Sequence, residues 1–236
     1  MILKKDRSLK KLIICLYFIV AGIEITAELF SYKPLLFIFK PLISLLLMLL
    51  YWKTSNQKNG MFITVLSLSL LTNMFFIPNT EKMLLIGIII FSLHRILTLF
   101  YIIKLTKVKD YFPLIISVIP FLFVFFYLFA ISNEIPRSSY YVLIVQIILV
   151  SILGGIGLAD YAMNDNKRNT WLLIYALLSV ALSFIVFIEK WYLSDIAPTV
   201  FRPLAMILNT AVYYTFYKFV IEAEKPKMSG KSVSLN

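Results

Sequence analysis

Residues 112–131 read FPLIISVIPFLFVFFYLFAI, and this stretch decides the class of the fold. It contains no Asp, Glu, Lys, Arg or His, and as an α-helix it is about 30 Å long, the thickness of the hydrocarbon core of a bilayer. The rest of the chain is similar, because 61% of its 236 residues are hydrophobic and only 15% are charged. Soluble domains are far less apolar. The sequence therefore predicts an integral membrane protein.

Seven further apolar runs are separated by short polar segments that are typical of turns between helices. We predict an all-α bundle of about eight transmembrane helices, over residues 12–30, 35–52, 60–77, 83–105, 112–131, 140–163, 170–190 and 198–220. Residues 1–221 are expected to form one polytopic membrane domain. Residues 222–236 are expected to be a disordered cytoplasmic tail. Pro41 lies early in the second run, where it can kink a helix.

The basic residues predict the orientation of the chain. Most of the 23 Lys and Arg residues fall on one side if both termini are cytoplasmic, as the positive-inside rule requires. Basic inner loops beside anionic lipids explain the net charge of +11, so we expect the lipid bilayer as a partner and no nucleic acid. The first run extends to Phe30 and is expected to be retained as a helix. Composition favours a bacterial inner (plasma) membrane as the location.

Few ionisable residues interrupt the apolar runs, namely Glu24, Glu28, His94, Arg95 and Asp160. A charge inside a membrane span costs about 2.5–3.5 kcal/mol on insertion scales, so such a residue usually has a partner or a function. These interruptions are therefore the first candidates for a functional site.

Glu24 and Glu28 are four residues apart, so they share one face of a helix and repel each other unless a cation or a proton lies between them. The candidate cations are Lys40, Arg95 and Arg202. The set can be an interfacial group of salt bridges that joins helices or a functional site, and the sequence favours neither.

His94 is the only histidine and Cys15 the only cysteine, which excludes a three-histidine zinc site and a cysteine cluster. We therefore predict no metal and no cofactor. Three of the seven glycines lie at 154, 155 and 157, just before Asp160, and should let a neighbouring helix approach closely. Asp160 itself is either a functional carboxylate or a hydrogen-bonding group at the end of a helix.

The order of several short motifs resembles the YhhN-like lysoplasmalogenases, a family of eight-span membrane proteins. The motifs that carry the resemblance are Lys40-Pro41-Leu42, Ser69-Leu-Leu-Thr-Asn73, Phe91-Ser-Leu-His94-Arg95-Ile followed by Tyr101, Gly155-Ile-Gly-Leu-Ala-Asp160, and Tyr213-Tyr214. None is specific alone, but their order covers most of the chain.

The resemblance implies hydrolysis of the vinyl-ether bond of a lysoplasmalogen, which gives a fatty aldehyde and a glycerophospho-alcohol. This chemistry requires an acid that protonates the β-carbon of the enol ether and a carboxylate that stabilises the resulting cation or activates water. In the family these roles are assigned to two aspartates, which correspond here to Asp160 and to the position of Asn73. The resemblance also suggests Lys40, with His94, Arg95, Arg202 and Tyr214, as substrate-binding residues.

The chain departs from the family pattern at Asn73, because an amide can neither donate an acidic proton nor carry negative charge. Either Glu24 or Glu28 substitutes for the missing acid, or the substrate differs from that of the family. The alternative is a catalytically impaired relative that binds lipid or has a structural role in the membrane. A transporter is a weaker third possibility, because no inverted repeat is evident. We further expect Asn73 and Asp160 to lie at opposite depths in the membrane, about 20 Å apart.

Overall fold

The structure is a computed structural model that describes residues 2–78, 80–106, 110–132, 135, 137–192 and 198–225. The described chain is helical, with short turns between its elements. Its eight α-helices are α1 (Ile2–Leu29), α2 (Lys33–Thr54), α3 (Gly60–Phe76), α4 (Glu81–Thr106), α5 (Tyr111–Ile131), α6 (Arg137–Met163), α7 (Lys167–Trp191) and α8 (Pro198–Ala223).

Seven of these helices are long and apolar enough to cross a membrane, which confirms the prediction of an all-α multi-pass fold. The exception is α3, whose 17 residues make it about 25 Å long and place it at the lower limit for a span. A crossing by α3 therefore stays a prediction.

The helix boundaries differ from the sequence prediction mainly at the two ends of the chain. Helix α1 begins at Ile2, ten residues earlier than expected, because lysine and arginine are good helix formers. Helix α2 runs unbroken through Pro41. Helix α8 continues to Ala223, so the boundary predicted at residue 222 falls within a helix, and residues 226–236 of the predicted tail lie outside the described chain.

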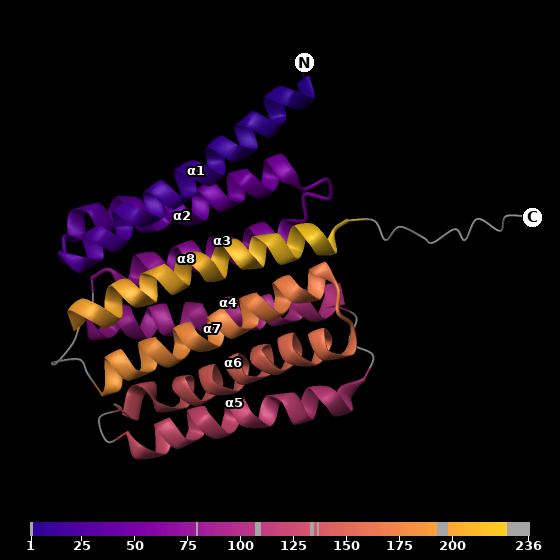
Figure 1. The fold of residues 1–236 in the computed structure, drawn as a ribbon. Coiled ribbons are helices and arrows are strands. Elements are labelled where there is room, and N and C mark those ends of the chain that lie inside the picture. Colours follow the sequence, from indigo (N-terminus) through magenta and orange to yellow (C-terminus); the bar gives the residue numbers. More distant parts are fainter. Residues whose placement is uncertain are drawn as a thin grey trace, which may run out of the picture.

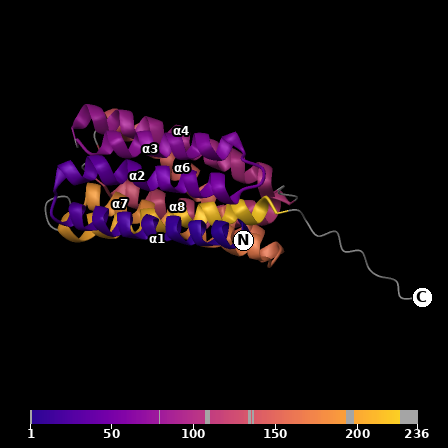
Figure 2. The ribbon, with the colours of Figure 1, turned by 90° about the horizontal axis from the view of Figure 1, so that it is seen from above.

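Successive helices run in alternating directions, so the start of α1 and the end of α8 lie at the same end of the bundle (Figure 1). We call this the terminal end and the opposite one, which holds the α1–α2 turn, the distal end. Seen from above, the helices remain roughly aligned with one another (Figure 2). An even number of spans requires this arrangement of the termini, whereas the cytoplasmic location of the terminal end stays a prediction.

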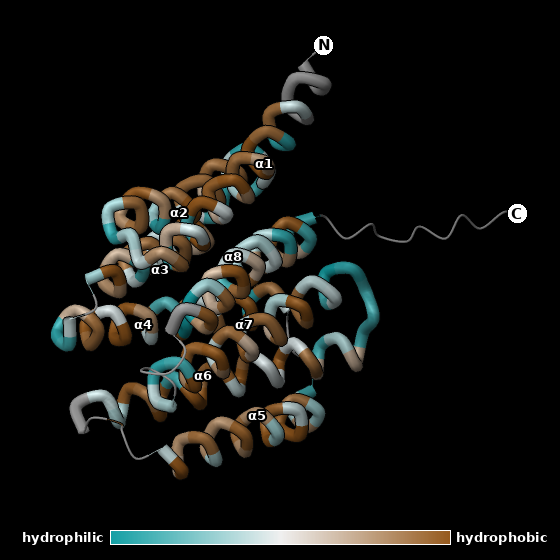
Figure 3. Tube along the Cα trace, turned by 60° about the vertical axis from the view of Figure 1, so that its left-hand side comes forward, coloured by the Kyte–Doolittle hydropathy of each residue, from teal (hydrophilic) through white to brown (hydrophobic). Residues whose placement is uncertain are grey.

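Helix α8 is central, with contacts to α1, α2, α4 and α7, while α5 packs along α6 at one edge of the bundle and α1 lies at the other (Figure 1). Hydrophobic residues cover most of each helix, and a conspicuous hydrophilic segment is the α6–α7 turn (Figure 3). Many large apolar side chains face outward, such as Phe112 and Phe123 on α5, which are 75% and 71% exposed. Such a surface is suited to lipid rather than to water.

Aromatic residues fill the core between the central helices. Phe216 of α8 lies among Phe62 of α3, Tyr175 of α7 and Tyr101 of α4, with ring centroids 4.9 to 6.4 Å apart. Tyr51 of α2 packs on Phe62 at 4.2 Å. These rings join helices that are distant in the sequence and fix the position of α8.

The glycines of α6 permit close helix packing, as predicted. A Cβ atom on Gly155 would lie 3.0 Å from the backbone nitrogen of Val118 in α5, and one on Gly157 would lie 3.3 Å from the carbonyl oxygen of Leu172 in α7. Both distances are shorter than ordinary van der Waals contact. The two glycines therefore set the spacing of α5 and α7 on either side of α6.

Candidate functional site

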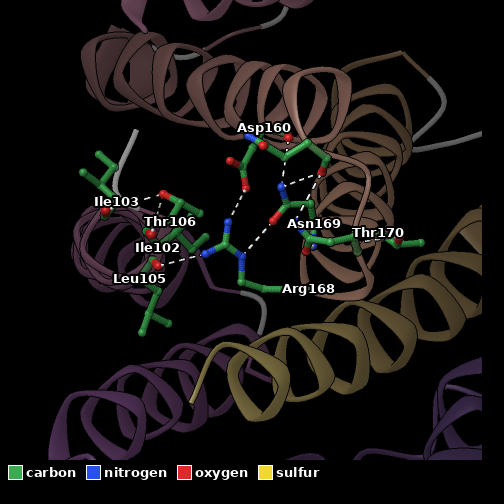
Figure 4. A network of polar contacts seen from close by, with 10 residues as sticks. Ile102, Ile103, Leu105, Thr106, Asp160, Arg168, Asn169 and Thr170 are labelled. Carbon is green, nitrogen blue, oxygen red and sulfur yellow. Dashed lines mark hydrogen bonds and ion pairs between the residues drawn. The ribbon is translucent and has the colours of Figure 1, made fainter. Parts of the chain in front are cut away.

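Asp160 lies at the terminal end of α6, in a network that joins three helices (Figure 4). Its Oδ2 is 3.3 Å from Nη2 of Arg168 at the start of α7. Arg168 also donates from Nε to Oδ1 of Asn169 at 2.7 Å and from Nη1 to the carbonyl oxygen of Leu105 in α4 at 3.3 Å. Asn169 Nδ2 in turn donates to the carbonyl oxygen of Asp160 at 2.9 Å. These contacts join the α6–α7 turn to α4 and give the Asp160 carboxylate a basic partner in Arg168.

Asn73 lies at the other end of the bundle. It is three residues from the end of α3, where Phe76 packs against Gly87 of α4. The Asp160 network contacts α4 at Leu105, and 18 residues of helix separate Leu105 from Gly87, or about 27 Å. The structure therefore does not bring Asn73 and Asp160 into one site.

Glu24, Glu28 and Lys40 come together in the distal half, on α1 and α2. Lys40 Nζ lies 3.1 Å from Oε2 of Glu28, and the Lys40 side chain is largely buried. Glu24 is 1% exposed, and its Oε2 has no hydrogen-bond partner among the described residues. The predicted charge pairing thus forms for Glu28, while Glu24 is left as a buried carboxyl without a bonded cation.

Arg202 also lies in the distal half, and its partner is a residue that sequence reasoning missed. Its Nε is 3.1 Å from Oε1 of Glu189, near the end of α7. Glu189 falls at the edge of an apolar run, so it was not recognised as an interruption. The long-range contact between α7 and α8 that pairs it with Arg202 has no local signal in the sequence.

His94 and Arg95 lie near the middle of α4 and are both largely buried. Arg95 Nη2 bonds to Oγ of Ser183 in α7, and its guanidinium stands 4.6 Å from the centre of the Phe91 ring. The His94 ring is stacked on the same ring, and its Nδ1 has no partner among the described residues. No carboxylate of the described chain lies within 4 Å of Arg95.

A cavity of about 30 Å³ lies beside this pair, between α4, α6, α7 and α8. Its polar lining comes from His94, Arg95, Thr98, Tyr175, Ser179, Asn209 and Tyr213. Neither Asp160 nor Asn73 lines it.

Of the two adjacent tyrosines in α8, the structure places Tyr213 and not Tyr214 beside the cavity. The Tyr213 ring lies 6.3 Å from that of His94. Tyr214 instead packs against Tyr17 and Phe18 of α1, with ring centroids 6.0 and 5.2 Å away. Because neighbouring positions on a helix point about 100° apart, the sequence motif alone could not separate their roles.

Searches against protein-family models, curated proteins and solved structures found no match for the chain. Among the described residues, no group of three His, Cys, Asp or Glu side chains is placed to hold a metal ion. The polar side chains beside the cavity and in the distal half include carboxyl, imidazole and hydroxyl groups that can donate or accept protons. Their lysine and arginine side chains can bind an anionic group.

Proposed function

We propose that the chain is a membrane lipid hydrolase of the lysoplasmalogenase type, with its site in the distal half and with Glu24 in place of the missing family aspartate. The observation that carries this proposal is the state of Glu24, a buried carboxyl that has no bonded cation, and one oxygen without a partner, among the described residues. A general acid needs a free carboxyl of this kind. Glu28, by contrast, is held by Lys40, and Asp160 by Arg168.

The depths of the distal residues suit a lysophospholipid. Glu24 lies about 7.5 Å inside the end of α1, Lys40 about 10 Å past the start of α2, and Arg202 about 6 Å past the start of α8. In a lysoplasmalogen, the vinyl ether and the phosphate are attached to the same glycerol, so the acid and the cations must lie at similar depths. Lys40 and Arg202 are the candidate phosphate-binding groups, provided that each exchanges its carboxylate partner for phosphate.

The reaction would proceed in three steps. Glu24 transfers its proton to the β-carbon of the enol ether, and an oxocarbenium ion forms that nearby negative charge, such as that of Glu28, stabilises. Water then adds to the cation and returns a proton to Glu24. The hemiacetal collapses to the fatty aldehyde and the glycerophospho-alcohol, so the oxygen of the aldehyde comes from water.

A second candidate is a catalytically impaired relative that binds lipid or serves as a structural membrane protein. The observation that favours it is the burial of Glu24, which is 1% exposed and does not line the cavity between α4 and α8. A substrate would reach Glu24 only after α1 moves away from its neighbours. Under this alternative, the ion pairs serve only to join helices.

Aldehyde release from lysoplasmenyl-ethanolamine by the purified chain in detergent separates the two candidates. The matched control substrate is the alkyl-ether lipid of equal chain length, which has no vinyl bond to protonate. The hydrolase proposal predicts release from the vinyl ether only, in the parent and in the Asp160→Asn variant alike. Absence of release by the parent, with release gained by Asn73→Asp, would establish the impaired relative instead.

A further inference from the structure

The cavity at the centre of the bundle contains an uncompensated positive charge. Arg95 is 8% exposed, near the middle of a helix of 26 residues, and its bonded partner in the described chain is the neutral hydroxyl of Ser183. An isolated charge in apolar surroundings is strongly unfavourable, so buried charges are normally paired. The Phe91 ring, whose centre lies 4.6 Å from the guanidinium carbon, recovers part of the cost through a cation–π contact. A bound anion would supply the missing partner.

Several further hydrogen-bond donors surround the same space. The hydroxyls of Tyr175 and Tyr213, the amide of Asn209 and the ring of His94 all belong to residues that line the cavity. His94 is buried, and its Nδ1 has no partner in the described chain. No carboxylate lines the cavity. Residues with donor groups therefore come from three helices, α4, α7 and α8, and they surround a cavity whose described lining contains one guanidinium and no carboxylate.

The size of the cavity limits which anion it accepts. One water needs roughly 10–15 Å³ of such volume, so about 30 Å³ gives room for about two oxygen atoms. A carboxylate has two oxygens, and their geometry matches the paired N–H groups of a guanidinium. A phosphate ester has four oxygens and is too large. The rest of the lining is apolar and includes Leu99, Leu149, Leu153, Leu182 and Val212, so the cavity holds the carboxylate group alone and any alkyl chain attached to it would lie outside this volume, between the helices.

We propose that this cavity binds a carboxylate, with Arg95 as the counter-ion and Tyr175, Asn209 and His94 as further hydrogen-bonding groups. The carboxylate belongs either to a small free acid or to a fatty acid whose chain extends between the helices. This site does not depend on the proposed hydrolysis, because the vinyl ether and its phosphate would be bound in the distal half by other residues.

The test is calorimetric titration of the full chain in phosphatidylcholine nanodiscs with octanoate, acetate, methyl octanoate and inorganic phosphate. The site predicts saturable binding of octanoate and none of methyl octanoate or phosphate. Acetate binding as tight as that of octanoate would indicate a small acid, whereas binding of octanoate alone would indicate a fatty acid. No saturable binding of either carboxylate, or tighter binding of phosphate, would overturn the proposal.

Variants connect the binding to the cavity. Arg95→Gln should weaken carboxylate binding at least about tenfold, which corresponds to the loss of a charge-assisted pair. The matched control is Arg168→Gln, which removes an arginine outside the cavity and outside the proposed hydrolytic site and should leave carboxylate binding unchanged. Tyr175→Phe and Arg95→Lys keep the packing more closely and should each weaken binding at least about threefold, so an unchanged affinity in both would exclude this cavity. Aldehyde release is measured on the same samples. Release without carboxylate binding would mean that this site fails and the hydrolysis stands, whereas carboxylate binding without release would mean the reverse.

Discussion

Ion pairs hold four of the described carboxylates of this bundle. The pair of Lys40 with Glu28 is the most buried of those described, with side chains 9% and 12% exposed. Asp160, Glu189 and Glu222 are also paired with basic residues. Glu24 differs from these residues, and this difference gives it the functional role in our account.

Removal of Lys40 alone should be more harmful than removal of both members of its pair. Lys40→Met leaves Glu28 as a buried charge without a partner, which costs about 3–5 kcal/mol in buried pairs. The double variant Lys40→Met/Glu28→Gln removes both charges and should regain much of that loss. Thermal unfolding in detergent measures both. Equal destabilisation by the single and the double variant would show that the charge left on Glu28 is not the cause.

Asp160→Asn should lower stability without lowering activity. The variant loses the charge that attracts Arg168. The Arg168 side chain is 21% exposed and keeps Asn169 and the Leu105 carbonyl as acceptors, so we expect a loss of about 1–2 kcal/mol. The control is Asp165→Asn in the same turn, where the side chain is exposed. Aldehyde release that disappears in Asp160→Asn, with an unchanged melting temperature, would contradict the structural role.

At the scale of helices, α6 is the element whose packing depends most on small residues. Gly155→Ala would place a methyl group 3.0 Å from the backbone of α5, and overpacking of this kind costs about 1–3 kcal/mol. Gly22→Ala in α1 is the matched control, because nothing lies within 4 Å of its added Cβ and alanine is the better helix former. We expect a lower melting temperature for Gly155→Ala and no decrease for Gly22→Ala. Equal melting temperatures would exclude a tight α5–α6 contact.

Helix ends show which boundaries depend on tertiary contacts. The end of α8 is held by Glu224, whose carboxylate accepts hydrogen bonds from Tyr51 of α2 at 2.5 Å and from Ser55 at 2.6 Å. Tyr51 Oη also accepts from the backbone N–H of Asn59. The hydropathy pattern ends at about residue 220 and contains no sign of these contacts. The sequence prediction therefore started the tail too early.

For the whole molecule, hydropathy predicts the helices well but not the site. Each apolar run of about 20 residues must form its own backbone hydrogen bonds in lipid, so its helical state is local information. The sequence does predict Lys40 as a candidate partner of Glu28, because a charge inside a bilayer usually has a partner of opposite charge. The pairing of Arg202 with Glu189 depends on how the consecutive helices α7 and α8 pack, and the cavity beside Arg95 depends on the packing of four helices, neither of which the hydropathy pattern predicts.

The described polar residues lie at three levels of the bundle, and among them the distal level alone combines a carboxyl that has no bonded cation with nearby cations. At the terminal end, Asp160 is part of a helix–turn network. In the centre, Arg95 lines a cavity without a carboxylate. The distal half contains Glu24 together with the Lys40–Glu28 pair. The central claim is therefore that Glu24 is the acid of a site in the distal half.

The most direct test of this claim is the rate of aldehyde release from lysoplasmenyl-ethanolamine by Glu24→Gln, compared with the parent and with Glu28→Gln. A missing general acid costs about 10²–10⁴-fold in rate, so Glu24→Gln should lose at least about a hundredfold while its melting temperature stays near that of the parent. Glu28→Gln, one helical turn away, should retain more activity because it removes a stabilising charge and not the proton donor. Release by Glu24→Gln at the rate of the parent would contradict the account.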